Sequence, residues 1–302
     1  MKQRVWSTLV TLAALVLAGC GKTSAPVQAT AGAPASSDDA QVASVLAGDP
    51  GAVNEDVYQQ SSEPQTVDQG GGFAAIRPLQ FWRTITDVQS SIDTQFGPPG
   101  PDGRPTNALV TIHRRLLGTF NVAGLSVTPG DTTREVVHKP LEDLWTRRVA
   151  LVRVVTADDP DGRWRLAGTS GVDVHTRAGA THVVSLHIGT ETLDTTITDP
   201  LELHRLRNAI RLPAGAEVSL TATTGDPTDV VFFYGGDMRR RFKNNGDGTF
   251  TFTFTNGRTP GLRHFGVDAF SHGSLFDDQA PYDSDAWILQ YVQSPQAMPT
   301  GS

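Results

Sequence analysis

The sequence contains a single cysteine, Cys20, in 302 residues. One thiol cannot form a disulfide within the chain, so the fold must be stable without covalent cross-links. The chain also lacks any run of lysine and arginine interleaved with aromatic residues, and its net charge is −7 at pH 7. The one basic cluster, Arg239–Arg241, would point its side chains to alternating faces of a strand. Nucleic acid is therefore not an expected partner.

Short catalytic motifs are also missing. The sequence has no G-x-S-x-G element, no G-x-G-x-x-G or phosphate loop, and no H-E-x-x-H pair. Ser170 follows Gly168 and Thr169 without the flanking pattern of a nucleophile elbow. Paired carboxylates are recognised by their distance in space, so the sequence leaves a glycosidase open. Four tryptophans could form a sugar platform, but the core is the favoured position for them: Trp82, Trp145, Trp164 and Trp287.

The first twenty residues have the layout of an export signal. Lys2 and Arg4 precede a mainly apolar run, Val5–Val16, which is shorter than the roughly 20 residues of a spanning helix. The following Leu17–Cys20 resembles the lipobox of bacterial lipoproteins. This resemblance implies a signal peptide at residues 1–19, cleavage before Cys20, and acylation (palmitate among the acyl groups) that attaches the protein to a membrane. An ordinary signal peptide that happens to contain a cysteine is the alternative.

The position after the cysteine bears on which membrane is involved. Gly21 stands where the family places an aspartate for inner-membrane retention, so the resemblance favours the outer membrane if the cell is Gram-negative. Residues 20–72 are rich in Ala, Ser, Gly, Pro and Gln without apolar periodicity, which predicts a disordered tether. Such a chain spans on the order of 40 Å. Residues 295–302 are expected to form a disordered tail.

Residues 73–178 predict a small α+β domain. Apolar residues recur every three or four positions from Pro78 to Phe96, which predicts one long helix. Strands are expected at Ala108–Asn121, Arg134–His138 and Leu144–Val155, with a returning strand around Trp164 and Leu166. A long helix followed by a curved antiparallel sheet resembles the NTF2-like cone fold.

Residues 179–294 predict a second, all-β domain. Phe250, Phe252 and Phe254 alternate with threonines between two turns, so one face of that strand should contact a core. Short strands separated by turns at regular intervals, ending in "NNGDGTFTFTFTNGRTPGLRHFGVDAF", resemble a bacterial immunoglobulin-like β-sandwich. Asp199, Pro200 and Glu202 also predict a short helix that ends near Asn208.

One acidic cluster could bind calcium. Four carboxylates within nine residues repel each other unless water or a cation separates them: Asp277, Asp278, Asp283 and Asp285. The alternative is a solvated acidic loop. Two further acidic segments, 159–162 and 245–248, lack the ligands of a calcium loop and are interpreted as turns.

The sequence thus predicts a mainly β lipoprotein of the cell envelope that acts as a non-catalytic binding or structural module. Its expected partners are the membrane, through lipidated Cys20, and an envelope protein or small ligand. One alternative is a hydrolase with its site in the concave face of the first domain, marked by a carboxylate or histidine of strongly shifted pKa. A second alternative is an adhesion-type module stabilised by calcium, and no other cofactor is expected.

Overall fold

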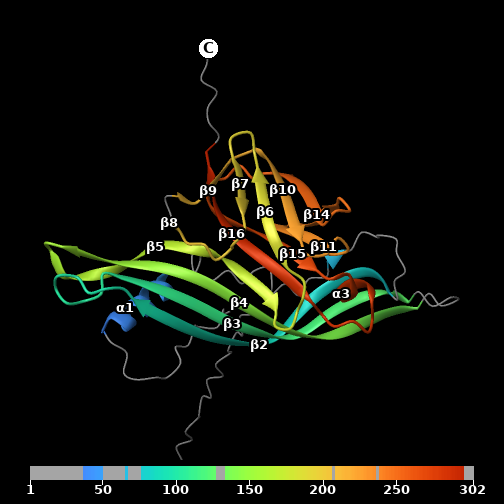
Figure 1. Cartoon of the computed structure of the whole chain (residues 1–302), viewed down its shortest axis with the longest axis horizontal. Coiled ribbons are helices and arrows are strands. Elements are labelled where there is room, and N and C mark those ends of the chain that lie inside the picture. Colours follow the sequence, from blue (N-terminus) through green and yellow to red (C-terminus); the bar gives the residue numbers. More distant parts are fainter. Residues whose placement is uncertain are drawn as a thin grey trace, which may run out of the picture.

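The chain folds mainly into β-strands. The computed structural model describes residues 37–49, 65–66, 76–126, 133–205, 208–235 and 238–295. Its strands form an eleven-stranded sheet and a five-stranded sheet (Figure 1). The predicted signal peptide, Cys20, most of the predicted tether and the tail beyond residue 295 lie outside the described residues.

Four long antiparallel strands form one half of the larger sheet. They follow each other in space in the order of the sequence: β2 (Ile76–Phe96), β3 (Asn107–Ser126), β4 (Arg134–Thr156) and β5 (Asp159–Thr176). The two strands predicted at Arg134–His138 and Leu144–Val155 are a single strand, β4. A two-residue strand, β1 (Gln65–Thr66), pairs with β2 at the outer edge.

The predicted long helix at Pro78–Phe96 is wrong, because this segment is strand β2. The pairing of β2 with β3 skips one residue after Pro78 and another after Ile85. Each bulge changes the face to which the following residues point. Ile85 and Val88 therefore both contact the core although they are three residues apart. Two bulges in a strand thus imitate the apolar spacing of a helix.

The larger sheet continues through strands from the end of the chain. Beyond β5 it runs through β16 (Ser284–Ser294), β15 (Gly261–Phe270), β11 (Val230–Gly235) and β12 (Met238–Arg241). Two short strands pair with this sheet outside that order: β8 (His204–Arg205) is antiparallel to β5, and β9 (Ile210–Pro213) is parallel to β16. One sheet therefore spans residue 178, where the two predicted domains meet.

The five-stranded sheet covers one face of β11, β15 and β16. Its order is β13 (Lys243–Asn244), β14 (Thr249–Thr255), β10 (Glu217–Thr224), β6 (Val183–Gly189) and β7 (Asp194–Ile197). The predicted face of β14 is confirmed, because Phe250 is buried and Phe252 and Phe254 pack partly buried against the same core. Phe233 of β11 lies 4.8 Å from the rings of both Phe252 and Phe254.

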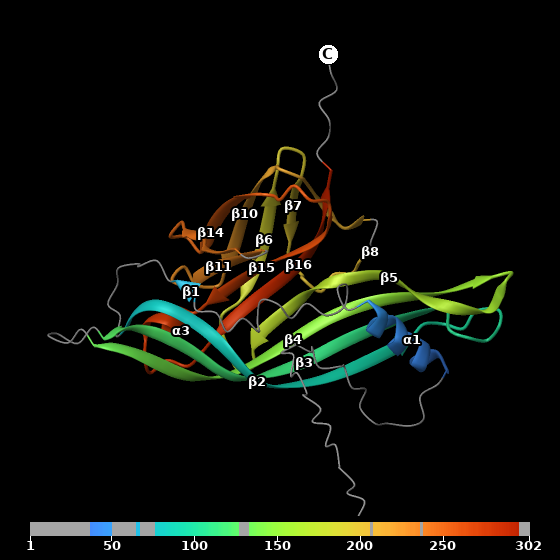
Figure 2. The ribbon, with the colours of Figure 1, turned by 180° about the vertical axis from the view of Figure 1, so that it is seen from behind.

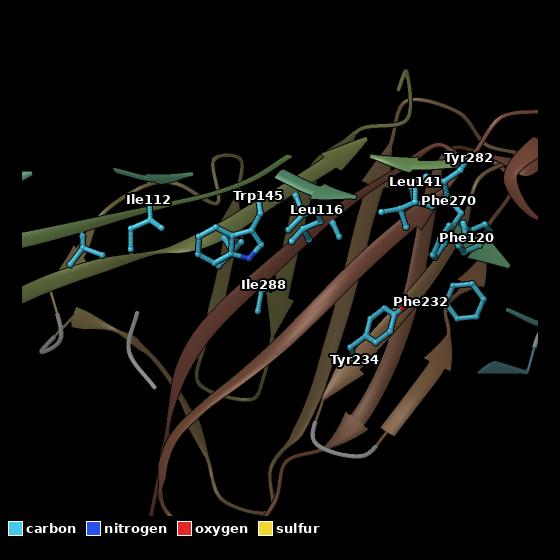
Figure 3. Close-up of a cluster of buried hydrophobic side chains, with 14 of the residues drawn as sticks. Ile112, Leu116, Phe120, Leu141, Trp145, Phe232, Tyr234, Phe270, Tyr282 and Ile288 are labelled. Atoms are coloured by element: carbon cyan, nitrogen blue, oxygen red, sulfur yellow. The ribbon is translucent and has the colours of Figure 1, made fainter. Parts of the chain in front are cut away.

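A second core fills the opposite face of β11, β15 and β16. The larger sheet curls so that β2 and β3 pack over these strands, and the Phe81 ring of β2 lies 5.0 Å from both Phe232 and Phe270. Figure 3 shows part of this core, where Phe120 of β3 lies beside Phe270 of β15. Successive residues of β16 alternate between the two cores, with Ile288 in this one and Trp287 in the other. The strands at the end of the chain are thus buried on both faces.

The described residues include two α-helices beside the sheets. Helix α1 (Ser37–Gly48) packs Val42 and Leu46 into the second core near β5 (Figure 2), so the disordered tether is wrong for this segment. Helix α3 (His272–Phe276) lies beside β2. The helix predicted from Asp199 is also wrong, because a turn and β8 occupy that position. Among the helices that the structure describes, none has the length and apolar character to cross a bilayer.

Candidate binding site

The four aspartates predicted as a calcium loop do not converge. Asp277 accepts hydrogen bonds from backbone N–H groups of its own turn. Asp283 and Asp285 instead accept from the segment 180–183, and Asp278 is exposed. Within the described ranges, no three His, Cys, Asp or Glu side chains are placed to hold a metal ion. Three of the four carboxylates thus accept hydrogen bonds from different backbone N–H groups, and Asp278 accepts one from the Gln279 side chain.

Asp285 is the most perturbed member of this set. Burial, together with repulsion from Asp173, raises the pKa of Asp285 to about 7. Its Oδ2 accepts a hydrogen bond of 2.8 Å from the Val183 N–H, while its buried Oδ1 has no hydrogen-bond partner. His175, directly opposite Asp285 across the strand pair, has a raised pKa because its ring bonds to Asp173. Asp285 and His175 thus form a pair of groups with raised pKa values where β5 and β16 are paired.

A second polar cluster lies inside the curled sheet, where the hydrolase alternative would place its site. The Arg83 guanidinium makes two hydrogen bonds to Asp268, of 2.8 and 3.1 Å, and a third to the Tyr282 hydroxyl. Tyr282 donates to Asp143, whose pKa burial raises to about 6. These four side chains are 0 to 4% exposed. A substrate has no access to the cluster, so its evident role is to pair charges within the core.

The core position is confirmed for three of the four tryptophans, whereas Trp82 is half-buried. Trp145, Trp164 and Trp287 are at most 4% exposed. Arg114 lies over the Trp145 ring at 4.5 Å, and the Trp164 indole donates a hydrogen bond to Asp38 of α1. Trp145 and Trp164 therefore pack in the core on one face of the larger sheet, and Trp287 packs in the core on the other face.

Two pockets that share His204 remain as the candidate site, and irregular residues of β5 line both of them. Opposite Arg148, β5 has two residues where β4 has one, and Ser170 accepts the Arg148 N–H through its hydroxyl at 2.9 Å. A second bulge adds Ala167. Bulges of this kind are frequent at functional sites because they redirect the neighbouring strand. At the residues next to these bulges, β5 pairs through its other edge with β8, which belongs to the segment 199–205, here called the crossover.

Glycines allow that crossover to approach β5. A Cβ atom on Gly168 would lie 2.6 Å from the backbone oxygen of His204, and one on Gly171 would lie 2.9 Å from that of Pro200. Both contacts are shorter than any side chain tolerates. Because Gly168 and Gly171 have no side chain, the backbone at His204 and Pro200 can lie this close to β5.

The first pocket, here called the junction pocket, lies between β5, the crossover and β16, and has a volume of about 250 Å³. Its wall is mainly apolar, with a few polar groups at its ends. The large apolar side chains are Ile197, Ile210, Leu262, Leu289 and Val292, and the polar ones include Thr169, Asp199, His204 and Gln290. Thr169 donates to Gln290 at 2.7 Å, so the pocket has a fixed polar end.

The second pocket, here called the sheet pocket, has a volume of about 360 Å³ and lies beside β8. Its floor consists of small residues, Ala150, Ala167 and Gly168, which explains the hollow. Larger side chains surround the floor: Leu109, Val152, Leu203, His204 and Arg205. His204 lines both pockets and stands between them.

Exposed apolar side chains gather at these two pockets. Among the described residues six large hydrophobic side chains are exposed, and three of them, Val152, Leu203 and Leu262, line the pockets. Apolar side chains that collect at a concave surface with a few polar groups are the usual mark of a ligand site. Ser170 is no nucleophile here, because its hydroxyl donates to the Gly171 carbonyl at 2.6 Å.

The sequence pointed to neither the pockets nor the core ion pair. The residues around Ser170 suggest only a comparison with a nucleophile elbow, and the pattern from Asp199 is typical of a helix N-terminus. The paired glycines at 168 and 171 were the one available signal of a close backbone approach. Comparison with known protein families, curated proteins and solved structures gives no match.

Proposed function

We propose that the protein is a lipid-anchored, non-catalytic binding module of the cell envelope, and that the junction and sheet pockets hold an apolar ligand. The gathering of Val152, Leu203 and Leu262 around two adjoining hollows carries this proposal. Burial of such side chains by a ligand contributes roughly 25 cal/mol per Å² of apolar surface. The resemblance of Leu17–Cys20 to a lipobox supports the lipid anchor. The resemblance of residues 179–294 to an immunoglobulin-like module supports a binding role for this part of the chain.

A hydrophobic fluorescent probe tests the pocket. Titration with 1-anilinonaphthalene-8-sulfonate should give saturable binding to the native protein, and Leu262→Ser should weaken it. Val184→Ser is the matched control, since Val184 is 53% exposed and lies outside both pockets. Equal binding by wild type and Leu262→Ser would contradict the assignment.

The anchor has a separate test. Cys20→Ser removes the thiol that the lipobox resemblance acylates, so the variant should leave the membrane fraction and appear in the soluble fraction. A protein with two or three acyl chains stays bound to a bilayer, whereas a protein without an acyl chain has no such anchor. If the variant still sediments with membranes, the lipoprotein assignment is wrong. The proposal that the pockets bind an apolar ligand does not depend on this result.

A further inference from the structure

The charged side chain that lines the sheet pocket is a cation. Arg205 lines this pocket, and Arg165 is paired directly with its wall residue Val152 across β4 and β5. Directly paired residues project to the same face of a sheet, so Arg165 flanks the sheet pocket on the side of Val152. Both arginines are exposed. Within the described part of the chain, neither side chain makes a hydrogen bond or an ion pair.

The junction pocket differs in charge. The one carboxylate in its lining, Asp199, is exposed and accepts a hydrogen bond from the Leu201 N–H at 2.8 Å. The rest of the wall is mostly apolar. The two pockets meet at His204, so together they offer an apolar compartment at one end and two cationic side chains at the other.

We propose that the paired pockets bind a single-chain anionic amphiphile, with its hydrocarbon chain in the junction pocket and its acidic head group beside Arg165 and Arg205. This inference rests on the proposed binding function and adds the class of ligand and its orientation. Arginine suits the head group because its guanidinium forms two parallel hydrogen bonds to a carboxylate or phosphate. Asp199 disfavours the reverse orientation, since an anionic head group beside it would be repelled.

Decanoate and decanol are the probes, because they share a chain length and differ in the charge of the head group. Isothermal titration calorimetry with the exported Cys20→Ser protein, which needs no detergent, should show decanoate binding roughly five- to tenfold more tightly than decanol. The double variant Arg165→Gln/Arg205→Gln should remove this difference and leave the affinity for decanol unchanged. Arg163→Gln is the matched control, since Arg163 lies on the same strand but bonds to Asp159.

The outcomes separate the two proposals. Equal affinities for decanoate and decanol in the wild type would overturn the anionic head group and leave apolar binding standing. Tight decanoate binding that the double variant does not weaken would overturn the orientation. Binding of neither probe would overturn both proposals. Sedimentation with phosphatidylglycerol vesicles, lost in the double variant, together with no decanoate binding, would identify a bilayer surface as the occupant and overturn the single-chain ligand.

A salt series gives an independent readout. The interaction of exposed arginines with an anionic head group is screened as ionic strength rises, because the Debye length falls from about 10 Å at 0.1 M to about 3 Å at 1 M. Decanoate affinity should therefore fall between 0.05 and 0.5 M sodium chloride, and decanol affinity should not. A decanoate affinity that is independent of salt would contradict the role of Arg165 and Arg205.

Discussion

Replacing Asp285 by asparagine should stabilise the protein at pH 8 and leave its stability almost unchanged at pH 4. Asp285 is 4% exposed, and burial raises its pKa to about 7. An unfolded chain has an aspartate pKa of about 3.9. The folded state therefore binds the proton more tightly than the unfolded state, and this contribution to stability is complete below about pH 4. It is lost as the pH rises through 7.

The size of the effect follows from the same two values. Three pKa units at about 1.4 kcal/mol each give an upper limit of about 4 kcal/mol between pH 4 and pH 8. The offsetting charge of His175 is already part of this raised pKa, so the measured difference should approach the limit, at about 2 to 4 kcal/mol. An asparagine oxygen can still accept the bond from the Val183 N–H at 2.8 Å, so the neutral side chain keeps the existing contact.

Urea denaturation of wild type and Asp285→Asn from pH 4 to pH 8 measures this difference. Other carboxylates also respond to pH: Asp143 and Asp229 titrate in the same direction, while Asp38 and Glu142 have lowered pKa values and lose stability as the pH falls. They are common to both proteins, so they cancel when the two free energies of unfolding are subtracted. Parallel curves, or a variant less stable than wild type at pH 8, would refute the reasoning.

Three further predictions follow from the packing. Asp268→Asn removes the carboxylate that holds buried Arg83 and should lower the free energy of unfolding by about 3 to 5 kcal/mol in urea denaturation; Asp194→Asn, with a side chain 90% exposed, should change it by less than about 0.5 kcal/mol. Gly168→Ala places a Cβ 2.6 Å from the backbone of β8 and should cost roughly 1 to 3 kcal/mol and weaken probe binding, whereas Gly225→Ala enters open space and should do neither. Because three of the four aspartates of the predicted calcium loop accept hydrogen bonds from backbone N–H groups, EDTA should leave the melting temperature unchanged within about 1 °C in calorimetry, and a larger fall would support the calcium site.

Local sequence patterns predicted the strands well where each strand keeps a regular alternation. The threonine and phenylalanine alternation of β14 located that strand and its core-facing side, because two neighbouring turns fixed both ends. The same reasoning failed for β2, because its bulges interrupt the alternation. Ile85 and Val88 point to the same core although they are three residues apart. The β-branched residues of β2, such as Ile85 and Val88, were the local evidence against a helix.

The charge network and the pockets could not be predicted from local patterns, because contacts distant in the sequence create them. Arg83 and Asp268 are separated by 185 positions and meet only after β2 curls over β15. The curl of the sheet decides which aspartate forms an ion pair with the buried arginine. The spacing of residues along the chain does not predict this pairing.

Strand β5 shows how one segment can serve both the core and the candidate site. At Val172–His175 it pairs with β16 and carries the larger sheet into the strands at the end of the chain. Four residues earlier, at Gly168 and Thr169, it pairs instead with β8. The two residues between, Ser170 and Gly171, are the bulge opposite Arg148, so the strand changes partner where its own ladder is interrupted. The junction pocket opens at this change of partner, and its position is therefore fixed by the same register that joins the two halves of the larger sheet.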